Sequence, residues 1–311
     1  MFKRIAVDVR SLATPHSGIG RYTQRLLEHL SGLMKDSDVE WFFYSDRPFT
    51  LPLGNLSNVT IRDFSRHNKT VSLIRSQVVF SYWARMDSID AFWSPRHHLP
   101  VFLDADIHTI VTIHDMVWRT HPETMKAANR MLERVLMPVS LNRASAIIAV
   151  SNATRIEIVQ SYPLHSGKIT VVHEAADPPV ETISPDYTYP YFLFVSTFEP
   201  RKNLKRILAA IEKSVTLVPE HFVFVGGAGW GIDLQFMVSE LSDMARSRCH
   251  FIGNVSEETL HAHYVGATAH IMVSLSEGFG LPALEAMSHS VPVIVSNRSA
   301  FPEVVGEGGF Y

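Results

Sequence analysis

The chain has 311 residues, of which 46% are hydrophobic and 19% charged, and its formal net charge is −3. This composition is that of a globular protein with room for two domains, and the slightly acidic balance argues against general nucleic-acid binding. A single cysteine, Cys249, excludes an intramolecular disulfide and suits a reducing compartment. The N-terminus leads straight into an apolar strand, which predicts no signal peptide, and no apolar run approaches the ~20 residues of a membrane span.

In the first half, short apolar runs alternate with amphipathic segments. The runs predict strands at 5–9, 41–44, 107–113, 146–150 and 169–172, and the segments between them predict helices at 21–33, 125–141 and 153–160. The stretch from 174 to 190 carries four prolines and breaks this rhythm, as a linker does.

After the linker the alternation resumes. Strands are predicted at 191–196, 222–225, 250–252, 269–274 and 291–295, with helices at 204–218, 234–247, 257–265 and 283–289. Asn203 and Ser256 stand where helix N-caps belong. The pattern predicts an α/β protein with two Rossmann-like parallel-sheet domains facing a cleft: residues 1–175, a linker at 176–190, and residues 191–311. Ligands of such sheets bind beyond the carboxyl ends of the strands.

Charge is divided unevenly between the halves. Residues 1–180 carry 20 Lys+Arg and 17 Asp+Glu, and the remaining residues carry 8 and 14, so that the net charges are +3 and −6. The basic half suits an anionic acceptor or lipid headgroups. Within it, residues 66–85 mix arginine and lysine with apolar side chains. An ordinary amphipathic helix packed on the sheet is the favoured interpretation, with a membrane-facing helix as the alternative.

The most informative motif is Glu277-Gly-Phe-Gly-Leu-Pro-Ala-Leu-Glu285, between a predicted strand and a predicted helix. Its glycines allow backbone N–H groups to approach an anion at the helix start. The carboxylates lie eight residues apart, about two helical turns, and are expected to share a face and accept hydrogen bonds from hydroxyl groups. A nucleotide-sugar has this combination of phosphate and hydroxyls.

A second motif, Glu199-Pro-Arg201-Lys202-Asn203, joins the first strand of the second half to its first helix. Cations do not favour a helix N-terminus, so Arg201 and Lys202 indicate an anionic ligand there.

Two weaker signals lie in the first half. Gly18-Ile-Gly20 precedes a helix and suits close approach to a diphosphate, although a plain tight turn explains it equally well. His114 follows a predicted strand, where it could contact a sugar hydroxyl or serve only the structure. The remaining histidines have no zinc spacing, and we expect no metal site.

These segments together resemble the retaining glycosyltransferases of the GT-B fold, family GT4, from Ile5 to the end of the chain. The Glu277–Glu285 motif is the most specific match. Thr197-x-Glu199-Pro-Arg201-Lys202-Asn203 is similar to the phosphate-binding segment of the mannosyltransferase-like branch.

The resemblance implies roles for individual residues. Arg201 and Lys202 would neutralise the donor diphosphate, and Glu277 would bind the transferred sugar. Gly18 and Gly20 would lie near the diphosphate, and His114 near the sugar. The remaining donor-binding positions would be Val255 beside the base, Gly278, Phe279, Gly280 and Leu281 in the backbone loop, and Glu285 at the ribose.

The resemblance further implies a metal-independent hexosyltransferase without a cofactor, with GDP-mannose as preferred donor and a glycan or lipid-linked acceptor in surface polysaccharide synthesis. Its location would be cytoplasmic, at the inner face of the membrane. Family members carry glycine where this chain has Ser290, and they continue beyond Tyr311 with a helix that crosses back, so that the second domain is expected to lack this crossover helix.

Three alternatives remain open. A GT-B epimerase or phosphorylase would share the fold, although no lysine arrangement for a pyridoxal cofactor is evident. A non-catalytic nucleotide-sugar-binding protein would keep the donor residues without turnover. A nicotinamide oxidoreductase fits the fold class but lacks the dinucleotide fingerprint.

Overall fold

The computed structural model describes residues 2–14, 17–35, 37–50, 56–64, 69–179 and 183–311. It divides the chain into two compact units, each discontinuous in sequence. The first comprises Met1–Met116 and Met131–Val172, and the second comprises Val117–Arg130 and His173–Tyr311.

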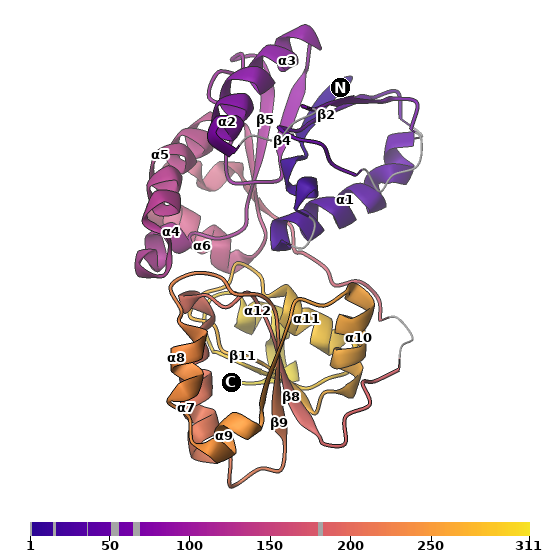
Figure 1. Cartoon of the computed structure of the whole chain (residues 1–311). Coiled ribbons are helices and arrows are strands. Elements are labelled where there is room, and N and C mark those ends of the chain that lie inside the picture. Colours follow the sequence, from indigo (N-terminus) through magenta and orange to yellow (C-terminus); the bar gives the residue numbers. More distant parts are fainter. Residues whose placement is uncertain (1, 15–16, 36, 51–55, 65–68, 180–182) are drawn as a thin grey trace. The chain divides into compact units, whose positions relative to one another are not determined.

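The first unit contains a seven-stranded parallel sheet in the order β3-β2-β1-β4-β5-β6-β7. Its strands are β1 (Arg4–Asp8), β2 (Glu40–Tyr44), β3 (Val59–Arg62), β4 (Ala91–Ser94), β5 (His108–Ile113), β6 (Ala146–Ala149) and β7 (Ile169–Val171). Helix α1 (Gly18–Lys35) covers one face, and α2 (Lys69–Ile74), α3 (Phe80–Met86), α5 (Ala127–Arg143) and α6 (Asn152–Ser161) lie on the other (Figure 1). The sequence did not predict β3 or β4.

The second unit contains a six-stranded parallel sheet in the order β10-β9-β8-β11-β12-β13. Its strands are β8 (Tyr191–Val195), β9 (His221–Val225), β10 (Cys249–Gly253), β11 (Ala269–Met272), β12 (Val293–Val295) and β13 (Gly309–Phe310). Helices α7 (Leu204–Ser214), α8 (Leu234–Ser239) and α9 (Asp243–Ser247) cover one face, and α10 (Glu257–Gly266), α11 (Leu281–Ser288) and α12 (Phe301–Val305) cover the other (Figure 1). The prediction of two parallel-sheet α/β domains is confirmed.

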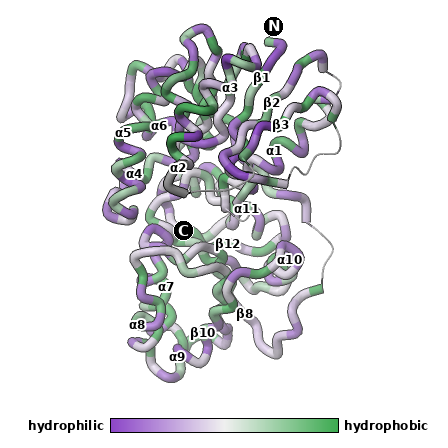
Figure 2. Tube along the Cα trace, turned by 45° about the horizontal axis from the view of Figure 1, so that its top comes forward, coloured by the Kyte–Doolittle hydropathy of each residue, from purple (hydrophilic) through white to green (hydrophobic). Residues whose placement is uncertain are grey.

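Apolar layers between helices and sheets explain this arrangement. On one face of the second sheet, Leu193, Met272 and Val293 pack against residues of α10 and α11, and on the other Phe194 and Phe224 pack against α7. The helices alternate between hydrophilic and hydrophobic residues along their length, as amphipathic helices on a sheet do (Figure 2).

The helix predicted at 234–247 is two helices. Helix α8 ends at Ser239, and the Ser242 hydroxyl accepts a hydrogen bond from Ala245 N–H and caps α9. The periodicity of apolar residues continued across this break, but the local hydrogen bonding of serine favours a new helix start.

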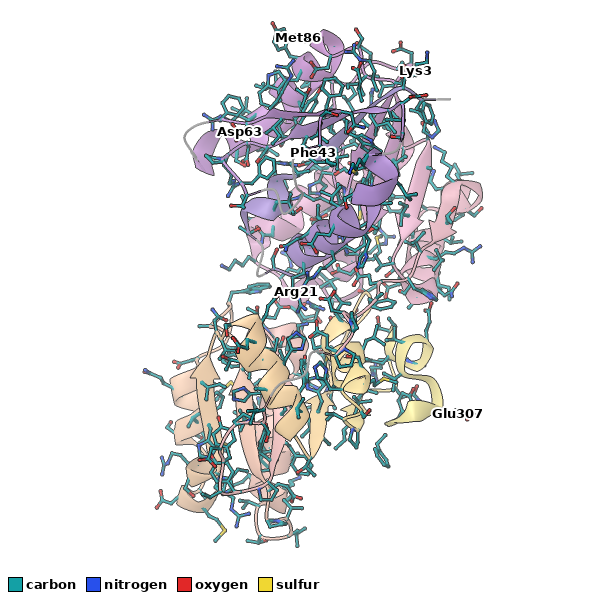
Figure 3. The ribbon with its side chains drawn as sticks, turned by 90° about the vertical axis from the view of Figure 1, so that its right-hand side faces the viewer. Lys3, Arg21, Phe43, Asp63, Met86 and Glu307 are labelled. Atoms are coloured by element: carbon teal, nitrogen blue, oxygen red, sulfur yellow. The ribbon has the colours of Figure 1, made fainter. Side chains whose placement is uncertain are left out.

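The segment around α2 and α3 agrees with the favoured prediction only in part. A π-helical turn, Arg75–Val79, joins the two helices, and their apolar stripe points to solvent. The stripe consists of side chains that are 44% to 59% exposed: Leu73, Ile74, Val78, Tyr82 and Met86. Figure 3 shows Met86 at the outside of this unit, whereas Phe43 lies inside.

The buried face of the same segment is largely polar. Ser76, Gln77 and Ser81 are buried beside Phe80, and the Gln77 side-chain carbonyl accepts a hydrogen bond from Val101 N–H at 2.9 Å. The segment nevertheless packs on the sheet as predicted, because Phe80 and Trp83 lie against Tyr44 of β2 with ring centroids 5.7 and 5.4 Å away. It carries in addition the exposed apolar stripe, which the sequence did not predict. Residues 66–68 of the predicted segment lie outside the described residues.

Candidate functional site

The two motifs of the second half meet at the carboxyl edge of the second sheet. Strands β8 and β11 are hydrogen-bonded neighbours, so the loops that follow them leave the sheet side by side. Leu275 N–H donates to the Arg201 carbonyl at 2.8 Å, and the Asn203 side-chain amide donates to the Val273 carbonyl at 2.9 Å. These bonds fix the Arg201–Lys202 loop against the Glu277 loop.

Four charged side chains form one network there. The Arg201 guanidinium lies 2.8 Å from a carboxylate oxygen of Glu277 and 2.8 Å from one of Glu199, and Lys202 Nζ lies 2.6 Å from the second oxygen of Glu277. Both carboxylates are buried. The two positive and two negative charges balance, so the guanidinium and ammonium groups are held in place without a ligand.

The network shifts the ionisation of its members. Burial opposes ionisation of Glu277, but Arg201 and Lys202 outweigh it and lower the pKa of this carboxyl group to about 2. Burial and then Arg201 lower the pKa of Lys202, while Glu277 acts in the opposite direction. Glu277 is therefore a carboxylate at neutral pH, able to accept hydrogen bonds.

Asn203 is the N-cap residue of α7, as predicted, but its side chain does not cap the helix. Its backbone is left-handed, with φ 62° and ψ 29°, and its side chain makes no capping bond because it donates to Val273 instead. Asparagine tolerates this conformation better than most residues, so the position serves the turn between Lys202 and the helix. Ser256 is confirmed as the N-cap of α10, since its hydroxyl accepts from Thr259 N–H.

Glu277 and Glu285 do not share a helix face. Helix α11 begins at Leu281, so Glu277 lies in the preceding loop, and only Glu285 is helical. The loop is fixed by Ser299, whose hydroxyl donates to the Glu277 carbonyl at 2.5 Å. Gly280 has φ 99°, and a Cβ there would lie 2.9 Å from a ring carbon of Phe301, so the turn into α11 requires glycine.

Glu285 lies deeper, against α10. Its Oε2 accepts a hydrogen bond from the Tyr264 hydroxyl at 2.8 Å, and both residues are buried. The Tyr264 ring is stacked on His289, with centroids 5.5 Å apart, and its edge meets His270. Sequence reasoning missed Tyr264, although its position near the end of a predicted helix that precedes the motif strand was a usable signal.

The remaining predicted donor-binding residues are distributed around this edge. Phe279 is buried with its ring 5.8 Å from that of His173, Gly278 lies in the same loop, and Leu281 is the first residue of α11. Val255 lies between β10 and α10 and packs against the apolar core.

The other predicted residues lie in the first unit. His114 follows β5, its Nε2 lies 2.9 Å from the Pro95 carbonyl, and its backbone N–H donates to His97 Nε2 at 3.1 Å. A Cβ at Gly20 would lie 2.3 Å from the Thr14 carbonyl oxygen, so this glycine allows close packing of the chain on itself. A Cβ at Gly18 would meet no atom within 4 Å.

His97 and His98 share the partly buried carboxylate of Glu133. Glu133 Oε2 lies 3.0 Å from His98 Nε2 and 3.5 Å from His97 Nδ1. Burial opposes protonation of His97, but Glu133 raises its pKa. Across the described residues, no group of three or more His, Cys, Asp or Glu side chains has the arrangement of a metal site.

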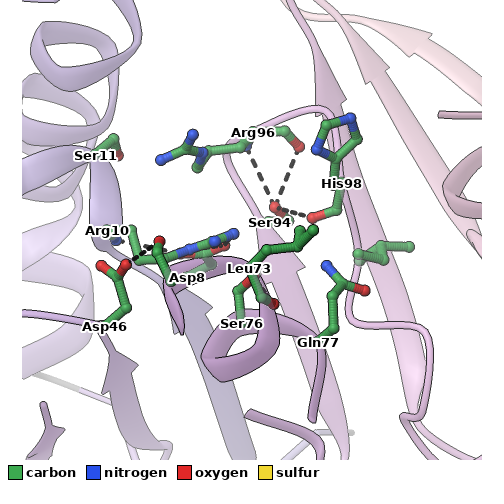
Figure 4. Close-up of polar contacts among 12 residues, drawn as sticks. Asp8, Arg10, Ser11, Asp46, Leu73, Ser76, Gln77, Ser94, Arg96 and His98 are labelled. Atoms are coloured by element: carbon green, nitrogen blue, oxygen red, sulfur yellow. Dashed lines mark hydrogen bonds and ion pairs between the residues drawn. The ribbon is translucent and has the colours of Figure 1, made fainter. Parts of the chain in front are cut away.

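A second charged cluster, which the sequence did not reveal, lies at the carboxyl edge of the first sheet. It contains Asp8, Arg10, Asp46 and Arg96, from the segments that follow β1, β2 and β4 (Figure 4). The strand before Arg96 was not predicted, which is why the convergence of these residues could not be foreseen.

The sequence matches two family models that together span most of the chain. The model described as Glycosyltransferase Family 4 matches residues 16–179, and the one described as Glycosyl transferases group 1 matches residues 181–310. The chain belongs to glycosyltransferase family 4. It is therefore a glycosyltransferase of the GT-B type.

Two bacterial members of the family resemble the whole chain. The O-antigen chain mannosyltransferase B of Escherichia coli is 29% identical, and the O-antigen chain mannosyltransferase RfbU of Salmonella typhimurium is 26% identical. Each alignment covers 98% of this chain and 85% of the relative.

Solved GT-B structures share the fold at low identity. Sucrose-phosphate synthase from Thermosynechococcus elongatus has a TM-score of 0.74 at 15% identity, covering 99% of this chain and 85% of that one. Anabaena HepE in complex with UDP and glucose has a TM-score of 0.69 at 17% identity, covering 100% and 85%. None of the helices in the described parts of this family member is long and apolar enough to cross a bilayer.

Proposed function

We propose that this family member is a retaining mannosyltransferase that uses GDP-mannose to extend a surface glycan. The observation that carries the proposal is the network of Arg201, Lys202 and Glu277 at the carboxyl edge of the second sheet. It combines fixed cations for a diphosphate with a carboxylate for sugar hydroxyls. The names of both relatives that align with the whole chain support mannose and an O-antigen-like acceptor.

Each residue has a proposed task in binding the donor. Arg201 and Lys202 bind the diphosphate, and Glu277 accepts hydrogen bonds from the transferred sugar. The backbone of residues 278–281 adds N–H donors where α11 begins. Glu285 holds the ribose hydroxyls, Val255 borders the base, Gly18 would lie near the diphosphate and His114 near the sugar. Gly20 would serve that region indirectly, because its missing side chain lets the start of α1 pack on Thr14.

The chemistry requires no protein nucleophile. The bond between the anomeric carbon and the phosphate oxygen breaks as the acceptor hydroxyl attacks from the same face, and the acceptor proton passes to the departing phosphate. Arg201 and Lys202 stabilise the negative charge on the leaving nucleoside diphosphate, which is the role that a metal ion has in other transferases. We therefore expect metal-independent catalysis, in which preorganised charges supply most of the rate enhancement.

A ligand titration tests the donor. Thermal-shift measurements with GDP, UDP, ADP and dTDP, followed by GDP-mannose and UDP-glucose, should show stabilisation by GDP and GDP-mannose. Ligand at 100 times its Kd adds about 2.7 kcal/mol to the unfolding free energy. Stabilisation by UDP alone would instead indicate a UDP-sugar donor and would refute GDP-mannose; HepE is a GT-B structure in complex with UDP. Transfer of mannose that continues in EDTA would support the metal-free mechanism, and a strict Mg²⁺ requirement would exclude it.

The outward apolar stripe of α2 and α3 supports a location at the inner face of the cell membrane. A bilayer would cover the side chains that this stripe exposes, and Arg75 and Arg85 lie on the same segment near anionic headgroups. A lipid-linked acceptor would be reached from there. Replacing both Ile74 and Val78 by Gln should reduce co-sedimentation with phosphatidylglycerol vesicles, whereas Leu217→Gln, at an exposed position of the second unit, should not. Equal vesicle binding by all three proteins would refute the contact.

A further inference from the structure

Arg96 is a cation in the cluster of Asp8, Arg10 and Asp46 whose carboxylates already pair with other arginines. It lies two residues beyond the end of β4, and Ser94 fixes its backbone through a hydroxyl 3.1 Å from the Arg96 carbonyl. Its guanidinium is only partly exposed, and among the described residues it forms no ion pair or hydrogen bond. Figure 4 shows this group extending toward Arg10 and Ser11, away from His98.

The neighbouring charges are already matched. Arg10 forms a two-pronged ion pair with the fully buried Asp8, at 2.9 and 2.6 Å, and Asp46, also fully buried, pairs with Arg47 at 2.8 Å. Two carboxylates are thus satisfied by two guanidinium groups, and Arg96 adds an unbalanced positive charge. Burial and then Arg10 lower the pKa of Arg96, and the opposite effect of Asp8 and Asp46 is smaller.

The position of this excess charge in the sheet is one that binds ligands in other proteins. Strands β1 and β4 are adjacent, but the chain continues from β1 to β2 on one side and reaches β5 from β4 on the other. The strand order therefore reverses between β1 and β4. Open parallel sheets bind ligands outside the carboxyl ends of the strands at such a reversal, which is where Arg10 and Arg96 lie.

We propose that Arg96, backed by Arg10, binds a phosphate group of the acceptor at the strand-order reversal of the first sheet. A planar guanidinium matches the paired oxygens of a phosphate, and the bound anion would supply the charge that Arg96 lacks. This inference rests on the proposed function, in which Arg201 and Lys202 already serve the donor diphosphate. The anion that remains to be bound then belongs to the acceptor, such as a lipid-linked diphosphate.

Binding measured with the donor site filled tests this assignment. Isothermal titrations in saturating GDP should show binding of inorganic pyrophosphate and tighter binding of farnesyl diphosphate, and no binding of the neutral farnesol. Arg96→Gln should weaken the binding of pyrophosphate and of farnesyl diphosphate at least tenfold, and it should leave the affinity for GDP unchanged. Arg96→Lys keeps the charge but not the planar, two-pronged geometry of the guanidinium, so its anion affinity should lie between those of the wild type and Arg96→Gln. Arg134→Gln removes an exposed arginine of the same unit and should change neither affinity.

The outcomes separate this site from the donor site. Unchanged anion affinity in Arg96→Gln would overturn the proposal, as would an equal loss of GDP affinity, because Arg96 would then serve the donor. If pyrophosphate bound as tightly as farnesyl diphosphate, the site would not recognise the lipid, and the part of the proposal that names a lipid-linked acceptor would be wrong. The wild-type protein could bind no nucleotide and still bind farnesyl diphosphate in an Arg96-dependent way. The donor assignment would then be wrong, and the anion site at Arg96 would be supported.

Discussion

Lys202 Nζ lies 2.6 Å from Oε1 of Glu277, although the two residues are 75 positions apart in the sequence. The contact joins the loops after β8 and β11, and the other oxygen of the same carboxylate contacts Arg201. One buried carboxylate therefore sets the positions of both cations that we assign to the diphosphate.

Replacing Lys202 by Met should remove most of the transferase activity. The methionine fills much of the same volume but leaves the leaving group with one cation fewer, so we expect kcat/KM to fall by about 10²-fold. Steady-state kinetics with GDP-mannose would measure this loss. Lys205→Met removes an exposed lysine three residues further on and should retain activity. Comparable kinetics for the two variants would argue against a catalytic charge at Lys202.

Tyr264→Phe should weaken nucleotide binding through Glu285. Without the hydroxyl, the carboxylate loses the donor that fixes its orientation, and we expect about tenfold weaker binding of GDP. Binding of GDP-mannose should weaken by the same factor, because the ribose is common to both, and kcat should change little. Calorimetric titration would measure both affinities.

Tyr191→Phe is the matched control. Its hydroxyl is buried in the same core but donates to the His263 carbonyl at 2.8 Å, so its loss should lower the melting temperature without affecting GDP binding. In a Glu285→Gln background, Tyr264→Phe should have little further effect. Additive losses in that double variant would mean that Tyr264 acts independently of Glu285.

Glu157 should make the protein less stable as the pH rises. Burial, and then Asp115, raise the pKa of this carboxyl group to about 7. Between about pH 4.5 and 7 the folded state holds a proton that the unfolded state has lost, so the unfolding free energy falls across this interval. Glu157→Gln removes the effect, and its gain in melting temperature over the wild type should be larger at pH 8 than at pH 5. Glu240→Gln, at an exposed carboxylate, should show no such difference between the two pH values.

Ser290→Gly should stabilise the protein. Ser290 is exposed and has φ 60°, a left-handed conformation that costs a residue with a Cβ about 1 kcal/mol and costs glycine little. Chemical denaturation should therefore show a higher unfolding free energy. Ser214→Gly, at the last residue of α7, should lower it, because φ is not positive there and glycine only adds conformational freedom to the unfolded chain. A loss of stability in Ser290→Gly would show that its hydroxyl matters more than its backbone.

The sequence predicted the two sheets because buried parallel strands form continuous apolar runs that are easily recognised. It missed β3, whose Thr60 and Ile61 are exposed, and β4, whose four residues gave no extended run. The two motifs that we assign to the donor could be recognised because each is local and follows a strand. The cluster around Arg96 could not be found in this way, since it depends on which strands become neighbours.

Helix orientation was also beyond sequence reasoning. The period of apolar residues around α2 and α3 predicted a helix with one apolar face, but periodicity does not state which face the sheet will accept. Here Phe80 packs against Tyr44 of the sheet and Gln77 accepts a hydrogen bond from Val101 N–H, whereas Ile74 stays exposed. The sequence predicted that Glu277 is a carboxylate, but not that Arg201 and Lys202 contact it and lower its pKa, because these contacts join two different loops.

Residues 117–130 interrupt the first unit in the sequence but belong to the second unit. This has a consequence for folding during synthesis on the ribosome. Within this segment, the Thr124 carbonyl accepts a hydrogen bond from the Trp230 indole, and Lys126 lies 5.5 Å from the centre of its ring. Trp230 is made about a hundred residues later, while Met131–Val172, which complete the first unit, are made in between. The growing chain must therefore finish its first domain around a segment that still lacks its partners, and chaperones have that interval in which to bind it.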